Sequence, residues 1–258
     1  MSKDKHYLAQ HRSHDYGATM RRWKEVSRKA GLRTSELVRQ GGYPVYGIRS
    51  RKFVAGQPVL YVSAGCHGDE PAAVQGLLAW AEENTKILAK RNVVLMPCLN
   101  PWGLANNVRL NQDGEDLNRL FHRTDHPLIG AWAKFTAGVE FPLAVTLHED
   151  YDANGIYLYE LNPVVGHSYG EGLLQICEKI IPREPGSSIE GRKAVRGIVR
   201  RTRGVPKIDG LPEAITMFVG NATASLTFET PSEFSLFDRV RAQKAFVAGL
   251  FRFNWPIR

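Results

Sequence analysis

A histidine and a glutamate three positions apart stand where an apolar segment gives way to a helical pattern. In the stretch YVSAGCHGDEPAAVQGLL, which begins at Tyr61, His67 and Glu70 follow a turn of small residues and precede Pro71. Imidazole nitrogens and carboxylate oxygens are good zinc ligands, and a catalytic zinc ion typically keeps three protein ligands and a water molecule. The pair alone is weak evidence, because a loop histidine beside a surface glutamate is common.

Two further apolar segments also end in polar side chains. The stretch AVTLHEDYD runs into His148, and three acids follow within the next four positions. Simple packing explains such a group of ionisable side chains poorly, so His148 is a candidate third ligand. The stretch SLTFETP is also an apolar segment that leads into an ionisable side chain, Glu229. Its position suits a general base that removes a proton from water, although a solvent-facing glutamate at a strand end is the simpler interpretation of that residue alone.

A long polar stretch between these segments contains arginines that could act at the same site. It is NPWGLANNVRLNQDGEDLNRLF, residues 100–121, and it contains Arg109, Asp116, Asn118 and Arg119. Guanidinium groups can stabilise a developing oxyanion, and they can hold a carboxylate through two hydrogen bonds. Taken alone, the stretch is equally compatible with a surface loop that carries ordinary charges.

The elements that must position these residues alternate between strand-like and helix-like patterns. Strands are expected at residues 43–50, 58–65, 92–99, 141–148, 155–160 and 224–231. Helices are expected at residues 71–88, 169–181 and 235–253, and residues 1–40 are predicted to be a helical extension packed on the rest. The alternation predicts one domain, residues 1–258, built as a three-layer α/β/α sandwich around a mostly parallel or mixed central sheet. Ligands of such folds collect beyond the carboxyl ends of the strands, where His67, His148 and Glu229 are expected.

Composition restricts the class of protein. The 258 residues are 43% hydrophobic and 23% charged, without a low-complexity tract or an apolar run long enough for a membrane span. The first residues, MSKDKHYLAQHRSHDYG, lack the apolar core of a signal peptide. Three cysteines without a C-x-x-C pair argue against a disulfide framework. We therefore expect a cytoplasmic protein that does not act at a membrane.

The formal net charge of +8 raises the possibility of nucleic-acid binding. The one dense basic run, residues 192–207, holds seven Lys or Arg residues and no acid, but it has no interleaved aromatic residues and no nucleic-acid motif. We therefore expect no nucleic-acid partner. A solvated basic loop is one interpretation of this run, and an entrance that attracts acidic substrates is the other.

The motifs HGDE, RLNQDGEDLNRLF, LHED and TFET occur in the order seen in M14-type zinc carboxypeptidases. They also resemble the related succinylglutamate desuccinylase and aspartoacylase group. The resemblance runs from about Tyr61 to Glu229 and implies a zinc-carboxypeptidase-like fold with one Zn2+ per chain. It also implies a hydrolase that cleaves an amide bond next to a free carboxylate, in a peptide or an N-acyl amino acid.

The resemblance also implies individual roles, position by position. His67, Glu70 and His148 correspond to the zinc ligands, and Glu229 corresponds to the general base. Arg109 corresponds to the residue that polarises the scissile carbonyl. Two further roles follow in the same way: Asn118 and Arg119 would hold the substrate carboxylate, and Asp116 would orient a ligand histidine from behind.

This chain departs from the family pattern at several places, which leaves its function open. NPWG and NRLF replace the NPDG and NRNF of many carboxypeptidases, and NRLF is closer to the acylase group. No tyrosine follows Tyr169, so the mobile tyrosine of digestive carboxypeptidases is missing, while only a helix and a tail follow Glu229. A metallocarboxypeptidase is therefore the leading hypothesis, an N-acyl amino acid amidohydrolase is the alternative, and a non-catalytic zinc-binding module is a third. A second metal remains conceivable, because spare acids lie near the motifs: Asp69, Asp113, Glu149 and Asp150.

Overall fold

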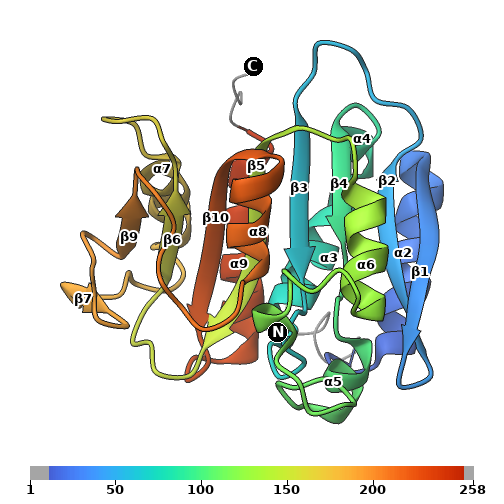
Figure 1. Cartoon of the computed structure of the whole chain (residues 1–258), viewed down its shortest axis with the longest axis horizontal. Coiled ribbons are helices and arrows are strands. Elements are labelled where there is room, and N and C mark those ends of the chain that lie inside the picture. The colour runs from blue at the N-terminus through green and yellow to red at the C-terminus, as the bar shows by residue number, and fades with distance from the viewer. Residues whose placement is uncertain (1–11, 253–258) are drawn as a thin grey trace.

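A mixed eight-stranded sheet forms the centre of the computed structural model, which describes residues 12–252 (Figure 1). The strands lie in the order β1-β2-β4-β3-β5-β10-β6-β9. Their bounds are β1 Leu32–Gln40, β2 Tyr43–Ser50, β3 Val59–Ala64, β4 Asn92–Met96, β5 Phe141–Asp150, β6 Tyr157–Leu161, β9 Ile198–Arg201 and β10 Ala222–Pro231. A separate small hairpin consists of β7 Ser188–Ile189 and β8 Arg192–Lys193.

The inner strands of this sheet run parallel. β3 pairs in parallel with β4 and β5, and β5 pairs in parallel with β10. The outer pairs β1–β2, β2–β4 and β10–β6 are antiparallel, and β9 returns parallel to β6. The carboxyl ends of β3, β5 and β10 therefore meet at one edge of the sheet, toward the bottom of Figure 1.

Helices cover both faces of the sheet, and the alternation of side chains along β3 shows why. Leu60, Val62 and Ala64 join one apolar cluster with α2, α3, α7 and α9, whereas Tyr61 points to the opposite face and packs with α6 and α8. The helix bounds are α2 Tyr16–Ala30, α3 Pro71–Glu83, α4 Thr85–Leu88, α5 Pro101–Asn106, α6 Pro127–Thr136, α7 Tyr169–Cys177, α8 Glu213–Gly220 and α9 Leu236–Leu250. The predicted three-layer α/β/α sandwich with a mixed sheet is confirmed.

The prediction that residues 1–40 are helical is wrong for part of that range. Within the described residues, helix α2 begins after the N-cap Asp15 and ends at Gly31, whose φ of 65° stops it. Residues Leu32–Gln40 then form edge strand β1 instead of more helix. The prediction rested on the helical spacing of Met20, Trp23, Val26 and Leu32, but Leu32 is the first residue of the strand. The part of the prediction on residues 1–11 lies outside the described residues.

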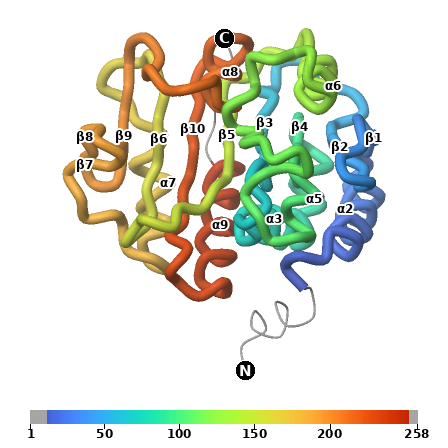
Figure 2. Tube along the Cα trace, turned by 60° about the horizontal axis from the view of Figure 1, so that its bottom comes forward, coloured from blue at the N-terminus to red at the C-terminus, as the bar shows by residue number. Residues whose placement is uncertain are grey.

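The polar stretch 100–121 contains more structure than its sequence indicated. Asn100 accepts a hydrogen bond from Gly103 N and caps α5, so the NPWG motif is the start of a helix. A short 3-10 turn, Leu117–Arg119, follows the N-cap Asp116. Figure 2 shows the connection between α5 and α6 beside the ends of β3 and β5. The helices α6 and α8 were not predicted.

No helix in the range 12–252 combines the length and apolar character needed to cross a bilayer.

Candidate active site

Four of the predicted site residues lie at the carboxyl edge of three neighbouring strands. His67 follows β3 after a short turn, and Glu70 is the residue directly before helix α3. His148 lies near the end of β5, and its partner in the parallel ladder is Glu229 of β10. Paired residues in a sheet project to the same face, so the register itself places Glu229 beside His148.

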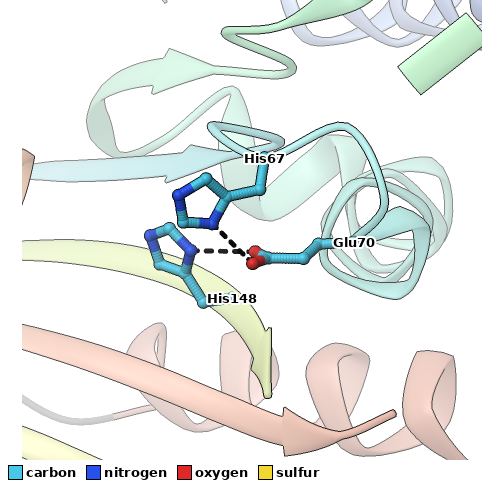
Figure 3. Close-up of side chains that lie close together, drawn as sticks. All are labelled: His67, Glu70 and His148. Atoms are coloured by element: carbon cyan, nitrogen blue, oxygen red, sulfur yellow. Dashed lines mark hydrogen bonds and ion pairs between the residues drawn. The ribbon is translucent and has the colours of Figure 1, made fainter. Parts of the chain in front are cut away.

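The side chains of His67, Glu70 and His148 converge on one point (Figure 3). The Nδ1 atom of His67 lies 2.5 Å from Glu70 Oε1, and the Nδ1 atom of His148 lies 2.8 Å from Glu70 Oε2. All three residues are buried. One carboxylate therefore holds two imidazole rings with the same nitrogen of each ring turned inward.

Burial and neighbouring charges shift the pKa values of this cluster in opposite directions. Burial disfavours the charged imidazolium of His67, but the neighbouring carboxylates of Glu70 and Asp116 outweigh burial and raise its pKa to about 9. Burial disfavours the Glu70 carboxylate as well, but the two histidines outweigh it and lower its pKa to about 2. The protein thus concentrates negative charge and imidazole nitrogens in a place that is nearly closed to solvent.

The arrangement fits a metal ion. One ligand atom from each of His67, Glu70 and His148 can be chosen so that all lie within 4.8 Å of one another. Two histidines and a glutamate form a known donor set of catalytic zinc sites, in which a fourth position stays open. Two of the four acids considered for a second metal make hydrogen bonds within the protein. Glu149 accepts from Ala72 N and from Arg239, and Asp150 accepts from Tyr157 Oη.

Asp116 joins the cluster to the arginine-bearing loop. Its Oδ1 lies 3.1 Å from His67 Nε2, on the side of the ring away from Glu70. Its Oδ2 accepts from Arg109, whose Nη2 lies 3.1 Å away, and Arg109 Nη1 lies 3.7 Å from Glu70 Oε1. Asp116 therefore orients His67 and holds the Arg109 guanidinium beside the cluster.

Asn118 and Arg119 are fixed by contacts with the segment that leads into α8. Asn118 Oδ1 accepts a hydrogen bond from Glu213 N, 3.1 Å away. The backbone oxygen of Arg119 accepts from Leu211 N at 2.9 Å, and Arg119 Nη1 donates to the backbone oxygen of Asn118. Both side chains border the same cavity as the His67–Glu70–His148 cluster.

That cavity has a volume of about 200 Å³ and brings seven of the eight predicted site residues together. Asp116, the eighth, lies behind His67 and outside the lining. Glu229 faces the cavity, and burial raises the pKa of its carboxyl group well above the usual value. The cavity continues past Glu229 along β10, β6 and β9, whose contribution the sequence did not indicate.

Two groups of residues at the site escaped sequence reasoning. The first is the far wall of the cavity, which includes Tyr157 and Tyr159 of β6 and Ser225 and Thr227 of β10. The period-two spacing from Glu229 back to Thr227 and Ser225 was a usable signal, because these residues share one face of a strand. No local pattern predicted that the two tyrosines lie at the site, because β6 reaches it only through its antiparallel pairing with β10.

The second group supports the cluster from behind. Arg239 of α9 donates to Glu149 Oε2, while Glu149 Oε1 accepts from Ala72 N at 2.7 Å, two residues after Glu70. Gln243, one turn further along α9, donates to the backbone oxygen of His148 at 2.8 Å. Helix α9 therefore fixes both the strand that carries His148 and the helix that follows Glu70.

Comparisons with known proteins agree with this geometry. Residues 56–132 match the family described as the succinylglutamate desuccinylase/aspartoacylase catalytic domain. Carboxypeptidase 2 of Trichophyton tonsurans is 28% identical over 156 residues, which cover 51% of this chain and 27% of that protein. The chain thus matches little more than a quarter of the length of that relative.

Solved structures show the same fold. The crystal structure of a candidate metallopeptidase from Shewanella amazonensis superposes with a TM-score of 0.83 at 22% identity, and covers 95% of each chain. A metallo-carboxypeptidase from Burkholderia cenocepacia superposes with a TM-score of 0.68 at 15% identity, over 92% of this chain and 68% of that one. The chain therefore has the metallocarboxypeptidase fold.

Proposed function

We propose that this protein is a zinc-dependent hydrolase that cleaves an amide bond next to a free carboxylate, as a metallocarboxypeptidase does. The observation that carries the proposal is the shared cavity. Its wall combines a possible metal site, a glutamate beside that site and two side chains that can hold a carboxylate. The carboxypeptidase relatives and the metallopeptidase fold support the same reaction class.

His67, Glu70 and His148 would hold the zinc ion. When bound, zinc lowers the pKa of a water molecule to about 7 and polarises a carbonyl group. Glu70 lies against both histidine rings and Asp116 lies against the other side of His67, so the three ligand side chains would face one ion.

Glu229 acts as the general base in this proposal. Burial raises its pKa, so its carboxylate is a stronger proton acceptor than a glutamate in water. It accepts the proton of the attacking water and delivers that proton to the leaving amine. The neighbouring strand β5 places His148 directly opposite Glu229, which keeps the base close to the reacting atoms.

The arginine-bearing loop supplies the remaining groups. Arg109 is held by Asp116 beside the cluster, where it can stabilise negative charge on the carbonyl oxygen. Asn118 and Arg119 hold the free carboxylate and thereby set which amide bond lies at the metal site.

The substitution Glu229→Gln tests the proposal. It keeps the shape of the side chain but removes its basicity, so bound zinc should stay near one per chain. Turnover of N-acyl dipeptides should fall by at least about a hundredfold, as general base catalysis contributes on that scale. The measurement pairs elemental analysis with kcat on the same preparation. A fully active Glu229→Gln enzyme would remove Glu229 from the mechanism.

An N-acyl amino acid amidohydrolase is a second candidate, and one observation favours it. The family match on residues 56–132 is to the desuccinylase and aspartoacylase catalytic domain. The two functions share the metal, the base and the carboxylate clamp. They differ in the group on the acyl side, so N-acetyl and N-succinyl amino acids should be assayed beside short peptides. A chain that binds zinc but hydrolyses none of these would instead be a binding module.

We also propose a cytoplasmic location. Cys66, Cys98 and Cys177 are buried and free, as expected in a reducing compartment. Fractionation of cells that express the tagged protein tests this location.

A further inference from the structure

Two long segments of the chain contain no acidic residue. Residues 37–68 and residues 84–112 each hold four Lys or Arg residues but neither Asp nor Glu, in a chain that has 26 acidic residues. These segments supply strands β2, β3 and β4 and the connections that lead into them. Positive charge is therefore concentrated wherever those connections meet.

The connection 51–58, between β2 and β3, projects from the end of the sheet opposite to the candidate active site, at the top of Figure 1. Asn92, the first residue of β4, holds this connection in place, because its side chain accepts from Val54 N at 2.8 Å and donates to the backbone oxygen of Val54. The hydroxyl of Ser50 donates to the backbone oxygen of Arg91 at 3.0 Å. The connection is therefore fixed beside the turn between α4 and β4.

Two further segments reach the same end of the sheet. Helix α2 ends there, because the strand that follows it begins opposite the last residue of β2. Helix α9 ends beside Arg91, whose Nη2 lies 3.5 Å from the backbone oxygen of Phe251. Basic residues from all four segments form what we call the basic end: Arg28, Lys29, Arg33, Arg51, Lys52, Lys86, Lys90, Arg91 and Arg252.

Few carboxylates offset the charge of the basic end. Glu25 pairs with Arg28 and Lys29. The two acids at the end of α3 pair with basic residues outside the basic end, on α2 and α9. Within residues 12–252, the other seven members of the basic end make no ion pair, and all of these except Arg91 are exposed. The basic end is therefore a surface that favours an anionic partner.

Exposed aliphatic side chains lie among these cations. Val54 is 53% exposed on the projecting connection, two residues after Lys52. Ile87 is 39% exposed on α4, next to Lys86. Apolar side chains interspersed with Lys and Arg suit the interface of a lipid bilayer, where the apolar groups enter the headgroup region and the cations meet lipid phosphates and carboxylates.

The basic end has few features that suit a nucleic acid. Proteins that bind single strands offer aromatic rings on which the bases stack, whereas Val54 and Ile87 are aliphatic. The nearby ring of Phe53 is covered by the guanidinium group of Arg49, 4.8 Å away. A duplex accepts a helix or a β-ribbon in its major groove, but α4 is only four residues long. An anionic bilayer is therefore the better match.

We propose that the basic end is a docking surface for an anionic lipid bilayer, with the tip of the connection 51–58 and the exposed face of α4 in contact with the interface. Each Lys or Arg close to an anionic surface raises the binding constant by about fivefold. Surface contact needs no membrane-spanning helix. The proposal replaces the expectation, drawn from the sequence, that the protein does not act at a membrane.

The proposal is compatible with the proposed function but does not rest on it. The candidate metal site lies at the opposite edge of the sheet, toward the bottom of Figure 1. Docking through the basic end would leave that edge on the side of the aqueous phase. None of the basic-end residues lines the cavity, so binding to a bilayer can be measured without any substrate.

Co-sedimentation with large unilamellar vesicles tests the proposal. The full chain is mixed with vesicles of phosphatidylcholine alone, and with vesicles of phosphatidylcholine and phosphatidylserine at a ratio of about 2:1, in about 0.1 M salt. The protein should bind the anionic vesicles at least about tenfold more tightly than the neutral ones. Raising the salt to about 0.5 M should remove most of that difference, because the charges are then screened over shorter distances.

Two variants and a control locate the contact. Lys86→Gln combined with Lys90→Gln should weaken binding to anionic vesicles by at least about tenfold, because two contributions of about fivefold are lost. Val54→Ser should weaken it severalfold by removing an apolar contact. Lys179→Gln combined with Lys193→Gln is the matched control, since it removes the same charge from exposed positions outside the basic end. The control should bind like the wild type.

Several results would overturn the proposal. These are equal binding to neutral and anionic vesicles, unchanged binding in the Lys86 and Lys90 double variant, and an equal loss in the control. Tighter binding to poly-uridine RNA than to anionic vesicles, lost in the same double variant, would assign the surface to a nucleic acid instead. Failure to hydrolyse any peptide or N-acyl amino acid would contradict only the proposed function, because vesicle binding is measured separately.

Discussion

His67 connects the two halves of the candidate site through its two ring nitrogens. Nδ1 faces Glu70 and the possible metal position, while Nε2 lies 3.1 Å from Asp116. Because a carboxylate on the far nitrogen fixes the orientation of the ring and its tautomer, Asp116 controls how well Nδ1 can bind a metal. Asp116 also holds Arg109, so a single carboxylate sets the positions of two proposed functional groups.

Replacement of Asp116 by alanine should therefore weaken metal binding without abolishing it. The expected loss is roughly 10- to 100-fold in zinc affinity, measured by competition with a chromogenic chelator. Asp113→Ala is the control, since Asp113 is an exposed acid on the same loop. Equal zinc affinity in Asp116→Ala and wild type would show that Asp116 does not support His67.

The residues that the sequence identified best are those whose role is local. His67 and Glu70 lie on one turn, and their spacing alone brings them together. Tyr157 and Tyr159 escaped prediction because β6 reaches the site only through the strand order β10-β6. That order is set by long-range pairing, which no local pattern in the sequence specifies.

Helix α9 determines the position of two other elements through buried polar contacts. Arg239 pairs with Glu149, which also accepts from the first turn of α3. Removing one member of a buried ion pair leaves the other charge without compensation. Arg239→Ala should therefore destabilise the fold by about 3–5 kcal/mol, measured by urea denaturation of the metal-free protein. Arg241→Ala removes a more exposed pair with Asp238 on the same helix and should cost less than about 1 kcal/mol. Equal losses in the two variants would contradict this account.

Helix α8 is joined to β3 by a buried acid. Glu213 accepts hydrogen bonds from Tyr61 Oη and from Ser63 Oγ, the latter at 2.8 Å. Burial raises the pKa of Glu213 to about 7, even though both hydrogen bonds favour its charged form. The native state therefore holds this proton over a pH range in which the unfolded chain, with a pKa near 4.5, has released it.

This difference predicts a pH dependence with a definite sign. The cost of ionising buried Glu213 is absent below about pH 4.5, grows as the pH rises and is complete above about pH 7. Glu213→Gln removes it, so the stability of the variant relative to wild type should improve between pH 5 and pH 8 by up to about 3 kcal/mol. Denaturation curves at the two pH values provide the measurement, with exposed Glu140→Gln as the control. A relative stability that does not change with pH would show that Glu213 titrates normally.

Elements with strong patterns were predicted well, and elements defined by context were not. Strands β3, β4, β5 and β10 are central and buried on both faces. Their sequences are therefore continuous apolar runs, which predict strands directly. Strand β1 was not recognised, because this edge strand is mostly polar and its buried and exposed residues do not alternate clearly. Helix α8 is only eight residues long and directly follows Pro212, so its periodicity was too short to recognise.

At the scale of the whole molecule, the sheet gathers residues from distant parts of the chain at one edge. β3, β5 and β10 are adjacent and parallel, so their carboxyl ends deliver His67, His148 and Glu229 to one place. Helices on both faces of the sheet support that edge. Helices α3 and α9 pack on one face, and α8 packs on the other. We propose that this edge binds one zinc ion.

Elemental analysis of the purified protein, with His148→Ala measured beside it, tests that claim most directly. His148 is one of three buried residues that could hold the ion, so its removal should lower the affinity far more than any change outside the cluster. We expect about one zinc per chain in the wild type, as for three protein ligands and one open position, and a loss of that zinc in His148→Ala. A wild-type protein that binds no zinc after reconstitution, or a His148→Ala variant that keeps it in full, would contradict the account.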